Sequence, residues 1–263
     1  MEDGRRRRGR RVAGVPAALA AVCVLAVAGI ASAEIIQAGN VDLRVNAKVQ
    51  PKKLPKKKRA PVKLKASAAI TTQDGSPAPG LKSAVVDFDV QGAVYTKGLG
   101  RCREAQIDEA GPALARRRCR DALVGRGSFR VELDGAENTA AGSVTGPLSV
   151  FNGRPVRRRP SLLVHASLPT TPAETFVVRG VIAKAPGSLY GRRVRLRVPE
   201  IAGGAGRLTA VKVRAKRRWR HRGKRRSYLL ARCQAGNFVF RGDLRFSDGT
   251  HANGSLIRWC RRR

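Results

Sequence analysis

Residues 83–90 read Ser-Ala-Val-Val-Asp-Phe-Asp-Val, the clearest strand pattern in the chain. Every even-numbered position in it is apolar: Ala84, Val86, Phe88 and Val90. Successive side chains of a β-strand point to opposite faces, so this alternation predicts a half-buried strand with one face in the core and its acidic face toward solvent.

The same alternation occurs elsewhere along the chain. Val194, Leu196 and Val198 alternate with arginines, and shorter examples begin at Phe129 and Phe238. Turn-forming pairs follow such segments: Asp74-Gly75, Asn152-Gly153 and Asp248-Gly249. Short alternating strands divided by turns predict a mainly β fold, an antiparallel β-sandwich or a barrel-like architecture.

One segment departs from the strand pattern. Residues 112–124 place apolar side chains at helical spacing, with Pro112 in the first turn and Gly125 at the C-terminal cap. The opposite face carries a group of arginines. We predict a short amphipathic helix that lies across the sheet with its arginines in solvent.

Residues 1–33 have the layout of a secretory signal peptide. A run of arginines precedes an apolar stretch from Val12 to Ile30, and Ala31-Ser-Ala33 follows it. This order predicts export, with cleavage after Ala33 and a secreted or extracytoplasmic location. Because the apolar stretch is long for a signal peptide, an uncleaved membrane anchor is the alternative.

Residues 34–263 are predicted to form a secreted β-rich domain. The alternative is two packed sub-domains, about 35–95 and 127–263, bridged by a helical segment at 96–126. No linker of low complexity divides these ranges, and this favours a single unit.

Four of the five cysteines follow the leader. An even number in an exported chain favours disulfides, and the short separations favour the pairs Cys102–Cys119 and Cys233–Cys260. A zinc site is the rival interpretation. The chain has no Cys-x-x-Cys motif, and its histidines do not follow a zinc-ligand spacing, so we expect no metal.

The composition is strongly basic, with 54 Lys and Arg against 18 Asp and Glu and a formal net charge of +36. Such a surplus suits electrostatic binding of polyanions at the cell surface. Anionic wall polymers, lipid headgroups and extracellular DNA without sequence preference are all compatible partners, and no signal identifies a protein partner. The alternative is a structural or envelope-interaction domain without a dedicated ligand, whose arginines are merely solvated.

Two clusters are the candidate polyanion-binding residues. The first is the cationic face of the strand near 193–198. The second is a basic block with a predicted hairpin tip at Arg222-Gly223-Lys224. Together they comprise Arg193, Arg195, Arg197, Lys216, Arg217, Arg218, Trp219, Arg220, Arg222, Lys224, Arg225 and Arg226. Guanidinium groups bind phosphate or carboxylate bidentately, and Trp219 and Tyr228 could stack on a base or sugar.

No motif of a known catalytic or nucleotide-binding class occurs in the chain, so we expect neither an enzyme nor a cofactor. A third class, an enzyme or a carrier of a small apolar ligand, requires a sizeable cavity inside a barrel. Its signature would be a wall with residues such as Phe176, Phe238 and Phe240 and a few converging polar groups.

Short motifs surround the turns and cysteines, among them Pro51-Lys-Lys-Leu-Pro55, Lys97-Gly-Leu99 before Cys102, and Phe246-Ser-Asp-Gly-Thr250 before Cys260. In these motifs the chain resembles a family of uncharacterised secreted β-rich proteins from high-GC actinobacteria, over nearly all of residues 34–263. The resemblance implies no known activity. It supports local pairing of the cysteines within a β-rich domain.

Overall fold

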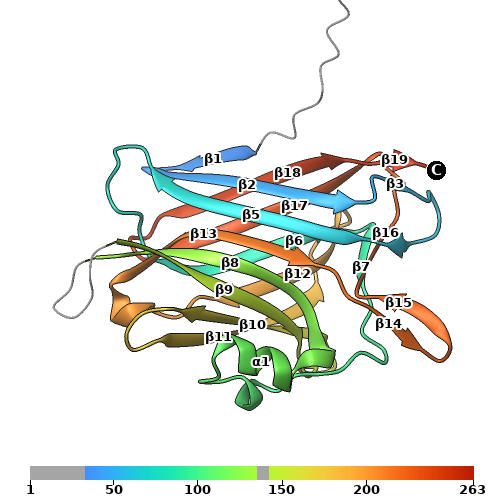
Figure 1. The fold of residues 1–263 in the computed structure, drawn as a ribbon. Helices are drawn as coiled ribbons and strands as arrows, with labels where there is room; N and C mark the ends of the chain where they lie inside the picture. The colour runs from blue at the N-terminus through green and yellow to red at the C-terminus, as the bar shows by residue number, and fades with distance from the viewer. Residues whose placement is uncertain (1–32, 135–141) are drawn as a thin grey trace, which may run out of the picture. The chain divides into compact units, whose positions relative to one another are not determined.

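The computed structural model describes residues 33–134 and 142–263 (Figure 1). The signal-peptide prediction concerns residues 1–33 and falls, apart from Ala33, outside the described residues. It therefore stays a prediction. Within the described ranges, no helix is long and apolar enough to cross a membrane.

Twelve strands form one antiparallel sheet that curls into a nearly closed, barrel-like structure (Figure 1). In spatial order they are β1 (Glu34–Ala38), β2 (Val41–Gln50), β5 (Lys63–Thr72), β13 (Gly206–Ala215), β8 (Leu123–Leu133), β9 (Gly142–Asn152), β10 (Ser161–Leu168), β11 (Glu174–Lys184), β12 (Tyr190–Arg197), β6 (Leu81–Asp89), β17 (Asn237–Phe246) and β18 (His251–Trp259). The prediction of a mainly β, antiparallel fold is confirmed.

Strands from early and late parts of the chain are neighbours within this sheet. β5 pairs with β13, and β6 lies between β12 and β17. The ranges 35–95 and 127–263 therefore share one continuous sheet, and a division into two packed sub-domains does not describe it.

Side chains, rather than a backbone ladder, bring the two edges of the sheet together. In the part of the chain that the structure describes, β18 lies beside β1 and β2 but pairs in a ladder with neither. Ile36 packs so closely on Gly254 that a Cβ there would lie 2.3 Å from the Ile36 Cδ1. Arg258 donates from Nε to the Ala47 carbonyl (2.9 Å) and from Nη2 to the Asn46 Oδ1 (3.2 Å).

Smaller sheets lie at one end of the barrel (Figure 1). They are β4–β16–β7 (Ala60–Pro61, Leu229–Ala231, Gly92–Val94), the hairpin β14–β15 (Arg218–His221, Lys224–Ser227) and the parallel pair β3–β19 (Lys53–Leu54, Arg261–Arg262). The strands β16 and β7 matter for the interior, because their residues form part of the wall described below.

The predicted helix is shorter than its sequence pattern. Helix α1 spans Pro112–Arg118, a 3-10 turn covers Arg120–Ala122, and β8 begins at Leu123. The prediction of a helix to residue 124 is wrong because residues from Leu123 onward pair with β9, and Gly125 is a strand residue, not a helix cap. As predicted, α1 lies across the sheet, beside β9 and β10.

Both predicted disulfides are present. Cys102–Cys119 ties the segment of α1 to a core cluster that contains Phe151 of β9. Cys233–Cys260 joins the residues after β16 to the end of β18. Two disulfides are compatible with an extracytoplasmic location, where thiols oxidise.

Two local predictions need correction. Asp87 and Asp89 lie two residues apart near the end of β6, on the face predicted to point toward solvent, yet both are buried, with exposed fractions of 1% and 3%. Protein groups, described below, donate hydrogen bonds to the two carboxylates in place of water. Asn152–Gly153 is not a turn, because Asn152 is buried in β9, and the chain turns later, at Arg157–Arg158.

Candidate functional site

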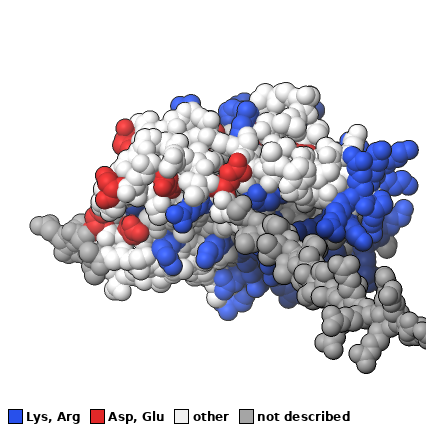
Figure 2. Space-filling model, turned by 90° about the horizontal axis from the view of Figure 1, so that it is seen from above, with Lys and Arg blue, Asp and Glu red and all other residues white. Residues whose placement is uncertain are grey.

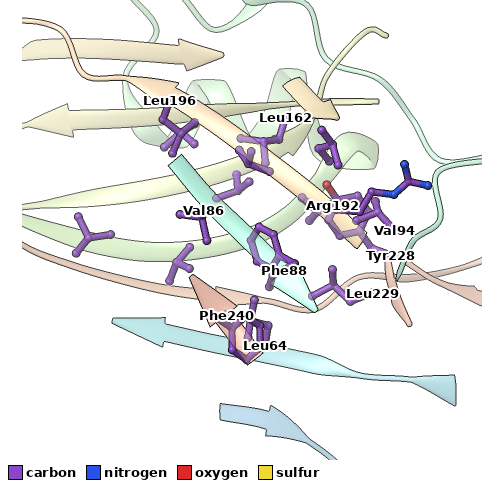
Figure 3. Close-up of a pocket in the computed structure, with 18 of the residues that line it drawn as sticks. Leu64, Val86, Phe88, Val94, Leu162, Arg192, Leu196, Tyr228, Leu229 and Phe240 are labelled. Carbon is purple, nitrogen blue, oxygen red and sulfur yellow. The ribbon is translucent and has the colours of Figure 1, made fainter. Parts of the chain in front are cut away.

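The barrel contains an apolar cavity of about 380 Å³ (Figure 3). Its wall consists of inward-facing residues from β2, β5, β6, β8 to β13 and β17, together with residues of β7 and β16. Phe88 and Phe240 meet edge to face in this wall, with 6.1 Å between ring centroids. Phe176, Phe238 and Phe240 all line the cavity, as the carrier hypothesis requires.

The interior is packed on one side and hollow on the other. Beside β1, β2 and β18, the side chains of Leu43, Ile70 and Phe246 belong to a continuous buried cluster. On the hollow side, short side chains such as Val164, Ala166 and Ala215 face the centre. A barrel of this many strands is wide, and side chains this short do not span it.

Few polar side chains reach the wall. Asp89 lines it, but the Asp89 Oδ1 accepts from the Gln91 backbone (2.7 Å) and the Oδ2 accepts from the Val239 backbone (2.8 Å). Arg192 lines it with an exposed side chain. The Tyr228 hydroxyl is buried and has no hydrogen-bond partner among the described residues, and burial raises the pKa of Tyr228.

The arginine row of β12 is only partly free for ligands. Arg195 and Arg197 are exposed and form no ion pair within the described residues. Arg193 instead donates bidentately to Asp87, from Nε to Oδ1 (2.6 Å) and from Nη2 to Oδ2 (2.8 Å). Of the three candidates on this strand, Arg193 is therefore a structural residue.

Asp87 joins three neighbouring strands. Besides Arg193 of β12, it accepts from Arg241 of β17, whose Nε lies 3.0 Å from the Asp87 Oδ2. Hydrogen bonds from Arg193, and then from Arg241, hold the pKa of Asp87 below its usual value although burial acts in the opposite direction. The sequence pattern shows the aspartate but not the two arginines that meet it.

The predicted hairpin is present, with a two-residue loop of Arg222 and Gly223, which both have positive φ. Lys224 already belongs to β15, so the tip is one residue shorter than predicted. Six candidates of the basic block are exposed: Lys216, Arg218, Arg220, Arg222, Lys224 and Arg225. Arg217 is half-buried, with its Nη2 3.7 Å from the Asp121 Oδ1.

The aromatic residues of this region pack within the protein. Trp219 stacks on Tyr95 with 6.0 Å between ring centroids, and its Nε1 donates to the Lys97 carbonyl (3.2 Å). Arg226 lies over the Tyr95 ring, 5.2 Å from its centroid. Tyr228 is 4% exposed. In this arrangement, Trp219 and Tyr228 are therefore not positioned to stack on an external base or sugar.

The structure does not bring the two candidate clusters together. The hairpin follows β13, whereas β12 is separated from β13 by four strands in one direction around the barrel and by six in the other. Arg195 and Arg197 therefore lie on the far side of the barrel from β13. A single polyanion-binding surface made of both clusters is not formed.

A second basic surface, which we call the basic groove, lies on the outer face of β2, β5, β13 and β8. Its charged residues are Lys48, Lys65, Arg126, Lys212 and Arg214. Lys48 pairs with Lys65, Lys65 with Arg214, and Arg214 with Arg126, so four cations stand side by side across the sheet. Within the described residues none of the five forms an ion pair.

The basic groove continues toward the hairpin. The positive charge of Lys216 lowers the pKa of Lys63, and Arg214 and Arg218 add to this effect. The sequence signal was present, because Lys212 and Arg214 alternate with valines as the arginines of β12 do. Which strands are neighbours, however, cannot be read from alternation.

The charge distribution is uneven. From above, Lys and Arg gather at one end of the molecule, and most Asp and Glu of that face lie toward the other end (Figure 2). Directly opposed like charges destabilise a sheet. A cationic surface of this kind is therefore suited to an anionic partner.

No group of three potential metal ligands occurs among the described residues. His165 is 1% exposed, and its Nε2 lies 2.7 Å from the Ala110 carbonyl oxygen, which requires a proton on Nε2. Burial lowers the pKa of His165. This histidine is thus buried and hydrogen-bonded beneath the segment of α1.

Comparisons of the chain with protein-family models, with curated proteins and with solved structures find no match.

Proposed function

We propose that this protein is a non-enzymatic, extracytoplasmic carrier that holds a small apolar or amphiphilic molecule inside its barrel. The observation that supports this proposal is the cavity of about 380 Å³ with its apolar wall. Ligand pockets of proteins are mostly apolar concavities of roughly 300–1,000 Å³, with a few polar groups that orient the ligand. The leader at residues 1–33 would deliver the protein across the membrane, with cleavage after Ala33.

The chemistry of the wall determines the class of ligand. Transfer of apolar surface out of water contributes about 25 cal/mol for each Å² buried. In a wall with so few polar groups, an aliphatic or aromatic ligand loses little hydrogen bonding, whereas a sugar or nucleotide would leave many groups unpaired. The cavity therefore favours lipid-like molecules over polar metabolites.

Filling the cavity should abolish this binding. Val164 faces the centre from β10, so Val164→Trp is expected to weaken binding of Nile red, a neutral apolar fluorophore, at least about tenfold. Since the added ring occupies empty space, the free energy of unfolding should change by less than about 1 kcal/mol. Fluorescence titration measures the first quantity and chemical denaturation the second.

Val181→Trp is the matched control, because Val181 lies on the outer face of β11, opposite Arg195 in the register. It should leave Nile red binding unchanged. If wild-type protein and both variants fail to bind Nile red, or if all three bind it equally, the barrel interior is not the binding site and the proposal is wrong.

A second candidate function is electrostatic binding of a polyanion, and the basic groove favours it. Strands lie about 4.8 Å apart, so the row from Lys48 to Arg126 extends over roughly 14 Å. Such a row, continued by Lys216 and Arg218 of the hairpin, could follow a linear polymer of phosphates. The exposed pair Arg195 and Arg197 would be a separate and smaller cationic surface.

Salt dependence distinguishes specific charge contacts from diffuse attraction. With duplex DNA as the probe, each phosphate contacted contributes about −0.9 to the slope of log affinity against log salt. The double variant Lys65→Gln/Arg214→Gln should reduce the magnitude of this slope by about 2, because it removes two contacts.

The double variant Arg195→Gln/Arg197→Gln removes the same charge from the far side of the barrel and should leave the slope nearly unchanged. Equal losses in both double variants would show that net charge alone attracts the polymer. No retention of DNA at low salt would contradict polyanion binding and favour a structural domain without a dedicated ligand.

A further inference from the structure

One end of the cavity is cationic. Arg192 lies at an inward-facing register position of β12, in line with Val194 and opposite Phe88 of β6. It is the only basic residue among the described residues of the cavity wall. Its aliphatic stem runs beside the wall, and its guanidinium points away from the Leu196 end of the cavity (Figure 3).

Other arginines strengthen the positive potential at this end. Burial lowers the pKa of Arg59, and the positive charges of Arg232 and Arg192 lower it further. Arg59 is held in place by donation from its Nε to the Gln91 carbonyl (3.2 Å). Asp89, the carboxylate of the wall, is occupied by backbone and side-chain amides and does not pair with these arginines.

Tyr228 lies at the same end of the cavity as Arg192 and Val94 (Figure 3). Its side chain is almost fully buried, and its hydroxyl has no partner within the described residues. Burial raises the pKa of Tyr228, so the hydroxyl keeps its proton and remains a donor. A buried donor without an acceptor is costly, and a ligand oxygen would relieve that cost.

We propose that the ligand is a single-chain amphiphile with one carboxylate head, whose chain fills the apolar cavity and whose head binds at the Arg192 end. This inference rests on the proposed carrier function and specifies its ligand class. Arg192 supplies a charge-assisted hydrogen bond to the carboxylate, and the Tyr228 hydroxyl donates to it when the chain is seated. The field of Arg59 and Arg232 adds to the preference for an anion over a neutral head.

The test compares two molecules that differ only at the head. Dodecanoate and dodecanol are each titrated against the purified protein with bound Nile red, and displacement gives both affinities. The wild-type protein should prefer dodecanoate by about tenfold or more, as expected for a hydrogen bond to a charged group. Arg192→Gln should remove this preference and leave the affinity for dodecanol unchanged.

Arg195→Gln is the matched control, because it removes the same charge from an outward position three residues along the same strand. It should keep the preference. If dodecanoate and dodecanol bind equally to the wild-type protein, the head-group inference is wrong while the carrier function stands. If neither displaces Nile red, the carrier function is wrong as well. If Arg195→Gln loses the preference as fully as Arg192→Gln, general charge explains it and the inference is overturned.

Tyr228→Phe provides an independent readout. Without ligand, the variant should be at least as stable as the wild-type protein, because it removes a buried hydroxyl without a partner. With ligand, it should bind dodecanoate about threefold to tenfold more weakly and dodecanol little differently. A variant that unfolds more easily and binds dodecanoate normally would show that the hydroxyl serves the fold, and it would remove Tyr228 from the site.

Discussion

Replacing Asp87 by asparagine is expected to lower the free energy of unfolding by about 3 kcal/mol. The carboxylate is 1% exposed and neutralises Arg193 and Arg241, which reach it from the two strands on either side. Without its charge, the two guanidinium groups would repel each other across β6. Since both arginines are partly exposed, we take the lower end of the range for removing one member of a buried ion pair.

Chemical denaturation of Asp87→Asn and Asp243→Asn tests this expectation. Asp243 lies on the outer face of β17, is 37% exposed and pairs only with His251 among the described residues. Its replacement should cost less than about 1 kcal/mol, as is usual for exposed pairs. Equal effects of the two variants would show that Asp87 is not the centre of a buried network.

Acid provides a further test of the same network. Because Asp87 has a lower pKa when folded than its ordinary 3.8, the unfolded chain binds protons more readily than the folded protein does. The stabilisation is therefore complete above about pH 5 and is lost progressively as the pH falls through 3.8 toward the lower pKa of the folded protein. Asp87→Asn should reduce the loss of unfolding free energy at acidic pH. If the variant loses stability in acid as steeply as the wild-type protein, Asp87 is not the group responsible.

Removing the Cys233–Cys260 disulfide is expected to lower the free energy of unfolding by roughly 3.5 kcal/mol, in the loop-entropy model for a separation of 27 residues. For a domain of this size the unfolding midpoint should fall by about 10 °C. The bond packs against Leu54 and Phe238, so its loss would also loosen one end of the cavity. The measurement is calorimetry of the variant with both cysteines changed to serine.

Removal of the Cys102–Cys119 disulfide provides the comparison with removal of Cys233–Cys260. The Cys102–Cys119 bond closes a shorter loop, with a separation of 17 residues, and lies in a different core cluster beneath α1. Its removal should cost roughly 3 kcal/mol. Because the two clusters are distinct, the two losses should add in the variant without either disulfide. A loss much smaller than the sum would show that the clusters are coupled.

Local patterns in the sequence predict the strands and the disulfides well. Alternation identifies the inward residues of β6 and β12 because it depends on one strand alone. Helical spacing alone predicts too long a helix at 112–118, because pairing of Leu123 and later residues with β9 overrides that spacing. The prediction of a turn at Asn152 fails for a similar reason. A buried strand position can hold an asparagine whose side chain has a partner, here the Gly100 carbonyl (2.7 Å).

The cavity and the basic groove depend on the order of strands around the barrel, which alternation does not specify. Lys65 and Arg214 are far apart in the chain and become neighbours only because β5 pairs with β13. Arg192 has the same parity as Val194, so its inward position was within reach of the pattern. The role of Arg192 at a cavity cannot be predicted from the pattern, because no local feature of the sequence shows that the interior is hollow beside it.

If an apolar molecule occupies the barrel interior, a crystal structure of the protein soaked with bromine-labelled dodecanol should locate it there. The neutral head separates this test from any role of Arg192. We expect an anomalous bromine peak inside the cavity, among Phe88, Val164 and Phe240. Bromine only on the outer surface, or an interior in which these side chains close the space, would contradict the account.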